Sequence, residues 1–489
     1  MKKNRMSTNT VAKNFLYNVM YQVLCIITPL ITTPYISRVL GADGIGTFSY
    51  VQAIASYFIL IGTLGSSLYG QREIAYVQRN ADKRTVVFKD IESLRLVTVV
   101  FASIVYFICF CRKGENQIIY LIFLIEIIAS GVDISWFFRG IQDFQKAVTR
   151  NFIIRIVSVF LVFVLVKSKS DVPMYAICYV VPIFVGNISL WFYLPQYLTR
   201  IKRGHIISAK HIKPLIALFI PQIATEVYLV LDKTMLGSLS RNMAEVGYYT
   251  QAQKLVQLAL KFITALGVVM LPKISDAFAQ KKYDEINKSI VHSINFILLL
   301  GFAIMFGLIG IASSFVPWFY GEGFDKVSLL ICLMAPVVVI IGISNVFGTQ
   351  YLLSVKLQKN YTLSVFTGMC VNLIFNFILI PLYGAIGATI ATLLAESSVS
   401  LVQLITVRNL LPIKRCFSGG WKYIFAGLIM LLSISFLKIY LPAIWISTFI
   451  LVICGMIIYF MVLFILKDKM LYMAIDLIKQ KLMNIRTSK

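Results

Sequence analysis

The chain has 489 residues, of which 59% are hydrophobic and 14% are charged. Soluble globular proteins carry about a quarter of their residues as charged side chains, so this composition excludes a water-soluble protein and indicates a membrane protein. The net charge of +25 is also typical of nucleic-acid-binding proteins. The positions of the basic residues along the chain distinguish a nucleic-acid partner from a membrane surface.

Long apolar runs follow one another along the whole chain. They have 17–28 residues each, enough to span ~30 Å of hydrocarbon as a helix. The first run follows MKKNR and has no small-x-small cleavage pattern after it, so we expect a retained helix rather than a signal peptide. We predict an all-α, polytopic membrane protein with about 14 transmembrane helices. The runs are 14–36, 45–70, 94–111, 118–138, 151–167, 172–194, 213–237, 247–272, 291–318, 327–353, 361–381, 385–407, 422–440 and 443–466.

The basic residues gather on one side of this arrangement. With the N-terminus inside, the cytoplasmic segments hold 35 of the 46 lysines and arginines, and the outer loops hold 8. An excess of Lys and Arg on the cytoplasmic side orients membrane proteins, so we predict that both termini are cytoplasmic. The positive charge then faces anionic lipid headgroups, and no nucleic-acid partner is predicted.

The sequence offers no catalytic or metal-binding pattern. The eight cysteines lie mostly within the runs, and the three histidines lie in loops or at run ends. A metal site needs several such ligands close together. The outer connections are short, whereas an enzyme acting on sugars outside the cell would need a catalytic loop there. We therefore predict a transporter without catalytic residues, metal or other cofactor.

Several runs contain charged side chains. Glu126 lies in run 118–138, Glu396 lies in run 385–407, and Arg38 stands just beyond the outer end of the first run. A charge near the bilayer centre costs about 2.5–3.5 kcal/mol, so such residues normally face a cavity or a partner. Arg38 marks either the mouth of a cavity or a snorkelling side chain. We expect Asp133 to pair with Arg155, because both lie close to the cytoplasmic end of their runs.

Runs 213–237 and 247–272 carry the most distinct polar stripes. Residues spaced by three, four or seven share a helix face, which groups Gln222, Glu226 and Lys233 and turns Asp232 elsewhere. By the same spacing, the second run presents Lys254, Gln257 and Lys261 on one face.

Counting from the cytoplasmic end places Glu226 and Lys261 at similar depth, near the middle of the membrane. Two lysines opposed by one obvious carboxylate indicate a water-filled cavity that receives an anion. The simpler alternative is that polar residues in the runs only tie helices together, at ~0.6–2 kcal/mol each. We favour that alternative for most neutral polar residues, and the cavity for Glu226, Lys254 and Lys261.

The chain also contains an internal repeat. The stretch RVLGADGIGTFSYVQA (38–53) follows the first run, and TMLGSLSRNMAEVGYYTQAQ (234–253) follows the seventh. Aligning their Leu-Gly pairs, with five extra residues in the second, matches Gly46 to Gly247. Two halves of six helices related in this way are a known plan of transporters. We predict lobes at 1–212 and 213–415, followed by an appended helix pair and cytoplasmic tail at 416–489.

Five stretches resemble one family of membrane transporters. They are PYISRVLGADGIGTFSYVQAI (34–54), YGQREIA (69–75), PQIATEVYLVLDKTMLG (221–237), VGYYTQAQKLV (246–256) and NLIFNFILIPLYGAIGATIATLLAE (372–396). They resemble bacterial polysaccharide-repeat-unit flippases of the multidrug/oligosaccharidyl-lipid/polysaccharide exporter superfamily. The resemblance implies a MATE-like arrangement of two six-helix lobes around a central cavity, in the bacterial cytoplasmic membrane.

The resemblance also implies a substrate and partners. The cavity would bind the pyrophosphate and sugars of an undecaprenyl-linked oligosaccharide while the lipid tail stays in the bilayer among membrane lipids. A polysaccharide polymerase and glycosyltransferases are the implied partner proteins. The product would be a capsule, exopolysaccharide or O-antigen.

Roles for single residues follow from this substrate. Cationic side chains can neutralise its two phosphates. The expected substrate-binding residues are Lys254, Lys261, Lys233, Gln222, Gln257 and Arg38. If transport is coupled to a proton or sodium gradient, the candidate coupling residues are Glu226, Asp232, Glu126 and Glu396.

Other interpretations remain open at this stage. A cation antiporter of the same superfamily would have about twelve spans and a cavity rich in carboxylates, whereas lysine predominates here. A polysaccharide polymerase would need a large outer loop, and a membrane acyltransferase an intramembrane histidine. A structural role in a biosynthetic complex would leave the polar stripes without a purpose.

Overall fold

The computed structural model describes residues 8–112, 114, 116–199, 209–473, 475–476 and 479–480, and these residues form helices and no strands. The prediction of an all-α protein is confirmed. Contacts divide the chain into two compact units, Met1–Gly247 and Tyr248–Lys489. The predicted boundaries at 213 and 416 rest on the repeat rather than on packing, and they stay predictions.

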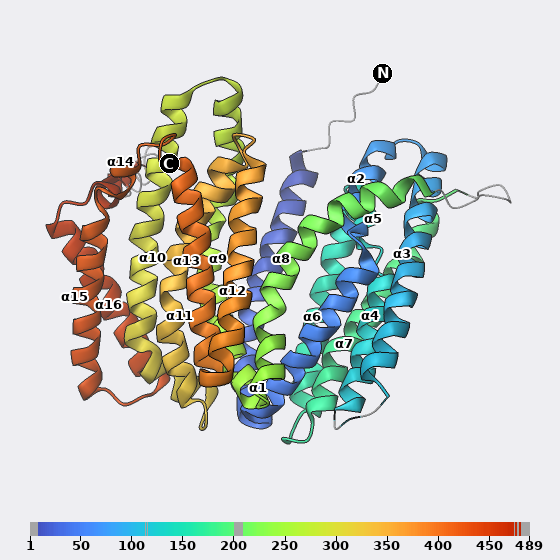
Figure 1. Ribbon diagram of the computed structural model, residues 1–489, viewed down its shortest axis with the longest axis horizontal. Coiled ribbons are helices and arrows are strands. Elements are labelled where there is room, and N and C mark those ends of the chain that lie inside the picture. Colours follow the sequence, from blue (N-terminus) through green and yellow to red (C-terminus); the bar gives the residue numbers. More distant parts are fainter. Residues whose placement is uncertain are drawn as a thin grey trace. The chain divides into compact units, whose positions relative to one another are not determined.

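The first unit contains α1 to α8 and the beginning of α9 (Figure 1). Its elements are α1 (Thr8–Thr63), α2 (Ser66–Val77), α3 (Ala81–Phe110), α4 (Gln117–Gly131), α5 (Ser135–Gly140), α6 (Phe144–Leu165), α7 (Val172–Ser189), η1 (Leu190–Gln196), η2 (Ala209–His211) and α8 (Ile212–Leu239). The second unit contains most of α9 (Met243–Ala279), then α10 (Tyr283–Tyr320), α11 (Asp325–Ser344), the π-helix η3 (Asn345–Leu352), α12 (Gln358–Tyr383), α13 (Ala385–Val407), α14 (Ile413–Phe417), α15 (Gly420–Leu437), η4 (Lys438–Tyr440) and α16 (Trp445–Ile465).

Helix α1 is two membrane spans joined by a sharp break. Its 56 residues would reach roughly 84 Å at ~1.5 Å per residue, far more than a ~30 Å hydrocarbon core. Gly41 interrupts the helix with φ 69° and ψ −179°, a conformation that is essentially restricted to glycine. The chain reverses there, which yields the two separate runs predicted at 14–36 and 45–70.

The number of spans agrees with the prediction once this break is taken into account. Among the described residues, twelve helices are long and apolar enough to cross a membrane, and residues 23–77 count as one of them. Separating the two arms of α1, and adding the 28-residue helix α8, gives the fourteen predicted spans within the described part of the chain.

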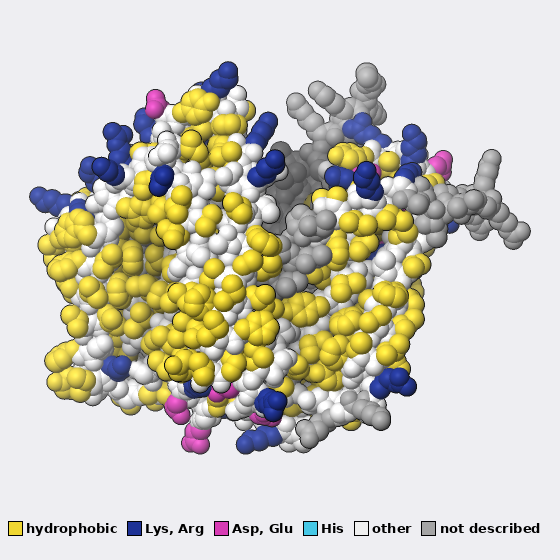
Figure 2. Space-filling view, viewed as in Figure 1, with side chains coloured by type: hydrophobic (Ala, Val, Ile, Leu, Met, Phe, Trp, Pro, Cys, Tyr) yellow, Lys and Arg dark blue, Asp and Glu magenta, His cyan; other side chains and the backbone are white. Residues whose placement is uncertain are grey.

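The outward faces of the helices are apolar, as expected where lipid is the solvent. On α3, Val97, Phe101, Ile104 and Ile108 follow one face, and each is more than half exposed. The opposite face of α3 packs into the unit through Val99, Ala102 and Tyr106, which are buried. Each unit shows a belt of hydrophobic side chains with charged side chains gathered beyond its ends (Figure 2). The chain is a multi-pass membrane protein.

An aromatic core closes one end of the first unit. The short helix α5 has the sequence SWFFRG, and its Trp136 stacks on Phe88 of α3 with ring centroids 5.6 Å apart. Gly70 of α2 lies directly under the Trp136 ring, where a Cβ atom would overlap the ring carbons. These contacts fix α2 and α5 against α3.

Helices α12 and α13 form a tight hairpin in the second unit. A single residue, Gly384 with φ +57°, connects them. Midway along the pair, Gly368 leaves room for the Val399 side chain. Towards the open end, Gln403 Nε2 donates to Ser364 Oγ at 3.1 Å. The two helices are therefore in contact along their length.

Candidate functional site

Helix α8 carries the first predicted stripe. Gln222 is half-buried, Glu226 is exposed and Lys233 is half-buried, whereas Asp232 is only 4% exposed. The carboxylate of Asp232 lies near the Tyr57 hydroxyl of α1. The helical spacing placed Asp232 and Glu226 on different faces of α8, and the structure agrees: Asp232 points into the first unit, and Glu226 does not.

Helix α9 carries the second stripe. Lys254 is half-buried, and Gln257 and Lys261 are exposed. All three lie on one uninterrupted helix of 37 residues, so the spacing that predicted a common face applies. Their role in binding an anion, and the opposition of Lys261 to Glu226, stay predictions.

Arg38 lies three residues before the break in α1. Its side chain is exposed, and its Nη1 donates to the Pro34 carbonyl oxygen of the preceding turn at 3.1 Å. This bond satisfies a carbonyl near the end of the first arm. The geometry is compatible with both roles foreseen for Arg38.

A polar group in the middle of the first unit was recognised only in part from sequence. Glu126 lies midway along α4, and its Oε2 is buried without a hydrogen-bond partner among the described residues. Tyr179 of α7 lies close to it and hydrogen-bonds to Gln52 of α1. Arg155 of α6 interacts with Tyr179 and places Nη2 3.6 Å from Cys25 Sγ. A buried carboxylate oxygen without a donor is unusual and is ready to accept a proton or a cation.

Asp133 pairs with a different arginine from the one predicted. Its Oδ1 lies 2.9 Å from Arg150 Nη1 and also accepts from the Ser135 backbone N–H at 3.0 Å. Arg150 donates in addition to Asn187 Oδ1 at 2.6 Å. Arg155 is five residues further along α6, which moves it roughly 7.5 Å and turns it about 140° from Arg150. The predicted Asp133–Arg155 pair is therefore wrong, although Asp133 does join α6 to the end of α4.

Glu396 lies half-buried on α13, near a contact between α13 and α9. One turn before it, Thr392 Oγ1 lies 3.1 Å from the Tyr249 hydroxyl of α9. Along α12, Asn376 Nδ2 donates to Asn372 Oδ1 at 3.1 Å, and both side chains are fully buried. These neutral polar residues join and stiffen helices, as the simpler interpretation expected.

A buried histidine anchors the beginning of α8. His211 is 3% exposed, the Tyr69 hydroxyl lies 2.7 Å from its Nδ1, and Asp90 Oδ2 lies 3.5 Å from its Nε2. Burial is the main cause that lowers the pKa of His211, and Lys210 adds to it. The neutral imidazole suits this site, because Nδ1 can accept from Tyr69 while Nε2–H faces Asp90.

The two repeated segments contact each other. A Cβ atom on Gly46 would overlap the Met243 carbonyl oxygen, and one on Gly247 would overlap the Ala42 carbonyl oxygen. Glycines at such positions allow helix backbones to approach closely within a membrane. The two glycines that the repeat matches are thus required for the same contact.

Comparison with protein families decides where the chain belongs. The family described as polysaccharide biosynthesis protein matches residues 11–278, more than half of the sequence. This chain belongs to the polysaccharide biosynthesis protein family. The family resemblance drawn from the five motifs is confirmed.

Relatives and solved structures agree with this family, the polysaccharide biosynthesis proteins. The "Putative O-antigen transporter" of Escherichia coli (strain K12) is 24% identical over 417 residues, covering 83% of this chain and 99% of that protein. The structure of the lipid II flippase MurJ in an inward closed conformation superposes with a TM-score of 0.75 at 19% identity, covering 93% of this chain and 99% of that one.

An inward-facing multidrug resistance MATE family transporter of the MOP superfamily reaches a TM-score of 0.56 at 12% identity, covering 78% of this chain and 97% of that one. At these identities the likeness shows a shared fold. The predicted MATE-like arrangement is confirmed.

Sequence reasoning missed three of the residues that organise these sites. Arg150 was not considered because it stands before the apolar run 151–167. His211 and Asp90 are 121 positions apart, and nothing in a single sequence relates them.

Proposed function

We propose that this polysaccharide biosynthesis protein is a flippase for undecaprenyl-pyrophosphate-linked oligosaccharide repeat units. It moves them from the cytoplasmic to the outer leaflet by alternating access, for the synthesis of a cell-surface polysaccharide. The observation that carries the proposal is the presence of ionisable side chains within spanning helices of both units, Glu126 and Arg155 in the first and Lys254 and Lys261 in the second. Similarity over 83% of this chain to the Escherichia coli relative, whose name is "Putative O-antigen transporter", supports it.

The lysines act on the phosphates. A pyrophosphate brings negative charge into the membrane, and charge-assisted bonds from Lys side chains offset the cost of removing it from water. Lys254 and Lys261 make the main contacts, since both project from one face of α9. The further residues of the binding path are Lys233, Gln222, Gln257 and Arg38.

The carboxylates provide the coupling to a proton or sodium gradient. Glu126 is the foremost candidate, because its Oε2 is buried without a donor among the described residues. Glu226 is exposed on α8 and takes part through direct contact with water. Asp232 and Glu396 complete the set of candidate coupling residues.

The protein works as a transporter and not as an enzyme, and it needs no cofactor. It lies in the bacterial cytoplasmic membrane with both termini on the cytoplasmic side, as the distribution of Lys and Arg indicates. Glycosyltransferases supply its lipid-linked substrate, and a polysaccharide polymerase consumes the product.

Translocation of the headgroup in proteoliposomes tests the proposal. A lipid-pyrophosphate oligosaccharide is offered to wild type, Lys261→Ala and Lys282→Ala, the last being a matched loss of an exposed lysine at the start of α10. We expect Lys261→Ala to lose most of the translocation and Lys282→Ala to keep it. Equal rates in all three proteins would contradict the role of Lys261.

A cation antiporter is the second candidate, favoured by the fold shared with the multidrug MATE transporter. The same vesicles are therefore loaded with a cationic dye. Dye efflux that survives Lys261→Ala but fails in Glu226→Gln, without movement of the lipid-linked sugar, would establish the antiporter instead.

A further inference from the structure

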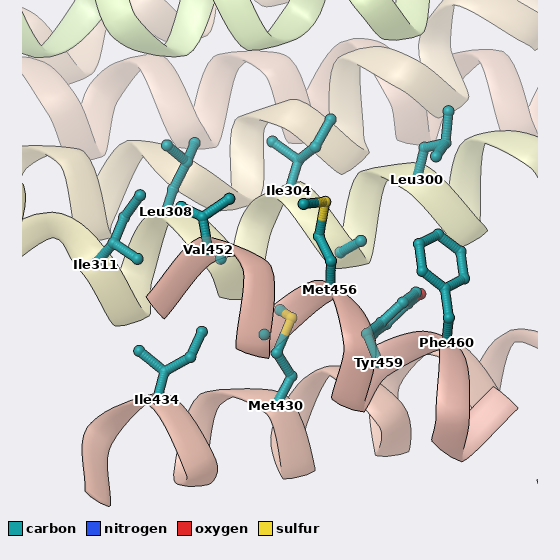
Figure 3. Close-up of a pocket in the computed structure, with 13 residues that line it drawn as sticks. Leu300, Ile304, Leu308, Ile311, Met430, Ile434, Val452, Met456, Tyr459 and Phe460 are labelled. Carbon is teal, nitrogen blue, oxygen red and sulfur yellow. The ribbon is translucent and has the colours of Figure 1, made fainter. Parts of the chain in front are cut away.

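The cavities of this protein differ in the chemistry of their linings. The groove between α10, α15 and α16 is lined by apolar side chains such as Ile304, Met430 and Met456 (Figure 3). Open space lies beside Gly307 in this groove, because a Cβ atom there would meet only Met430 Cε, at 4.0 Å. A pocket of the first unit contains charged side chains instead, which makes it a candidate for recognising a polar ligand.

This second pocket, the α2–α5 pocket, lies where α2 meets α5 and the turn that follows it. Its volume is about 300 Å³, which is in the range of small-ligand sites. Arg72 of α2 and Arg139 of α5 line it, together with Gln71 and Gln142. Its lining contains no carboxylate among the described residues. Two guanidinium groups in such a lining favour an anion, and above all a phosphate.

The stretch YGQREIA (69–75), one of the five that resemble the flippase family, divides into two sets of residues. Tyr69, Gly70 and Ile74 are buried in the first unit. The pocket is lined by the other set, Gln71, Arg72 and Ala75. Packing therefore accounts for the first set, and the pocket gives the second set a common position.

Close contacts hold α2 and α5 together around the pocket. A Cβ atom on Gly140 would lie 2.8 Å from side-chain carbons of Ile74 and 2.9 Å from the Gln71 carbonyl oxygen. One turn earlier on α2, Gly70 lies under the Trp136 ring. A site with walls fixed in this way is preorganised, because binding has no further backbone to order.

Arg72 keeps donors for a ligand. Its side chain is 46% exposed, and its Nε and Nη2 donate to Glu73 Oε1 at 3.3 and 3.2 Å. These bonds use two of the three guanidinium nitrogens, whereas the group has five protons to donate. An exposed ion pair of this kind is weak, so it yields readily to a phosphate.

Arg139 also has unused donors. Its Nε is buried and has no acceptor among the described residues. Its Nη2 reaches Ser135 Oγ only at 3.4 Å. Asp133 attracts Arg139 from inside the unit, but that carboxylate is already paired with Arg150. A buried donor without an acceptor is unfavourable, and a phosphate in the pocket would bring acceptor oxygens close to it.

The pocket also has an apolar edge. Leu68, one turn before Arg72, lines it and is 58% exposed, and Phe144 lines it from the start of α6. The distribution of Lys and Arg places the segments 71–95 and 139–155 on the cytoplasmic side of the membrane. Arginines beside exposed apolar side chains at this level suit an anion that is attached to a hydrocarbon chain.

We propose that the α2–α5 pocket captures the pyrophosphate of a polyprenyl-linked oligosaccharide in the cytoplasmic leaflet, before translocation begins. Arg72 and Arg139 bind the phosphates, Gln71 and Gln142 donate from their amides, and the first part of the hydrocarbon chain lies along Leu68. The capture site rests on the proposed function for its substrate class. It uses none of the polar residues of α8 and α9, so capture is a step separate from translocation.

Binding of farnesyl pyrophosphate to the purified, full-length protein in detergent tests the capture site. Isothermal titration calorimetry is performed on Lys254→Gln/Lys261→Gln, which lacks the two lysines proposed for translocation. In that background, Ala75→Glu places a carboxylate in the pocket, and Tyr76→Glu adds the same charge to α2 outside its lining. Both residues are exposed, so we expect both variants to fold. Ala75→Glu should weaken binding by about tenfold or more and Tyr76→Glu by less than about twofold, because repulsion between charges falls with distance and is screened over about 10 Å.

Arg72→Gln tests the arginine itself, and we expect it to weaken binding by about fivefold. Equal binding to Ala75→Glu and Tyr76→Glu, or no binding to Lys254→Gln/Lys261→Gln, would overturn the proposal. Competition by an equal concentration of phosphatidylglycerol would also overturn it, because the pocket would then belong to a membrane phospholipid.

Translocation in proteoliposomes separates this proposal from the proposed function. With both lysines present, Ala75→Glu should raise the substrate concentration for half-maximal translocation by about tenfold at the same maximal rate, whereas Lys261→Ala lowers the maximal rate. A lower maximal rate in Ala75→Glu would overturn the capture role, because the pocket would then take part in translocation itself. A protein that binds farnesyl pyrophosphate in the pocket but moves no lipid-linked sugar would refute the proposed function and support the binding site.

Discussion

Replacing Arg150 by glutamine should destabilise the first unit through its pair with Asp133. The two charged atoms lie 2.9 Å apart, and the side chains are 9% and 28% exposed. At an effective dielectric constant of ~20, unit charges at this distance attract by roughly 6 kcal/mol. Desolvation of both groups offsets most of this attraction, so we expect a coupling energy of about 2 kcal/mol. The total loss should be about 3 kcal/mol, because Arg150 also binds Asn187.

A double-mutant cycle isolates the pair from these other contacts. Arg150→Gln, Asp133→Asn and the double variant are unfolded at equilibrium in mixed micelles, and the coupling is the departure from additivity. Arg155→Gln is the matched control, since it removes an arginine from the same helix. Its coupling to Asp133 should stay within about 0.5 kcal/mol. A larger coupling to Arg155 than to Arg150 would refute the pairing seen in the structure.

Further predictions concern three single residues. Gly41→Ala should lower the free energy of unfolding by about 1–3 kcal/mol, because the backbone at residue 41 has a φ of +69° that suits only glycine. No atom obstructs the added methyl group, so the cost comes from the backbone alone. Equal stability of Gly41→Ala and Gly307→Ala would contradict this. Burial lowers the pKa of His211, so the unfolded chain, with a pKa of about 6.5, binds the proton first. Wild type should therefore lose thermal stability as the pH falls below about 6.5, until the folded-state pKa is passed; the same loss in His211→Gln would assign it to other groups. Glu126→Gln should abolish gradient-driven translocation but not substrate binding, whereas the control Glu322→Gln, in the turn between α10 and α11, keeps both. Full transport by Glu126→Gln would exclude Glu126 from coupling.

The spans were predictable from sequence because hydrocarbon thickness fixes their length. The run 385–407 coincides with α13, and the run 361–381 lies inside α12, Gln358–Tyr383. The rotation of a helix about its own axis was predictable where charged residues on that helix fall on different faces. Helix α8 is such a case, because Asp232 is buried and Glu226 is exposed. In each case the information is local: a stretch of apolar residues or a period along one helix.

Pairing between helices was not predictable, because it depends on the direction of a side chain as well as its depth. Arg155 lies only five residues beyond Arg150 on α6, but Arg150 alone is directed at Asp133. His211 and Asp90 are brought together by the packing of η2 on α3. A single sequence specifies neither the rotation of one helix against another nor the register between them.

The hairpin of α12 and α13 limits how the second unit can move. The two helices are connected by Gly384 alone, and Val399 packs against Gly368 midway along them. Near the open end Gln403 hydrogen-bonds to Ser364. These contacts leave no hinge between the two helices. Such a pair moves as one rigid body, because a rotation of either helix must move the other helix with it. Amide protons in the middle of α12 and α13 should accordingly exchange with solvent through one shared opening event, as a single cooperative block.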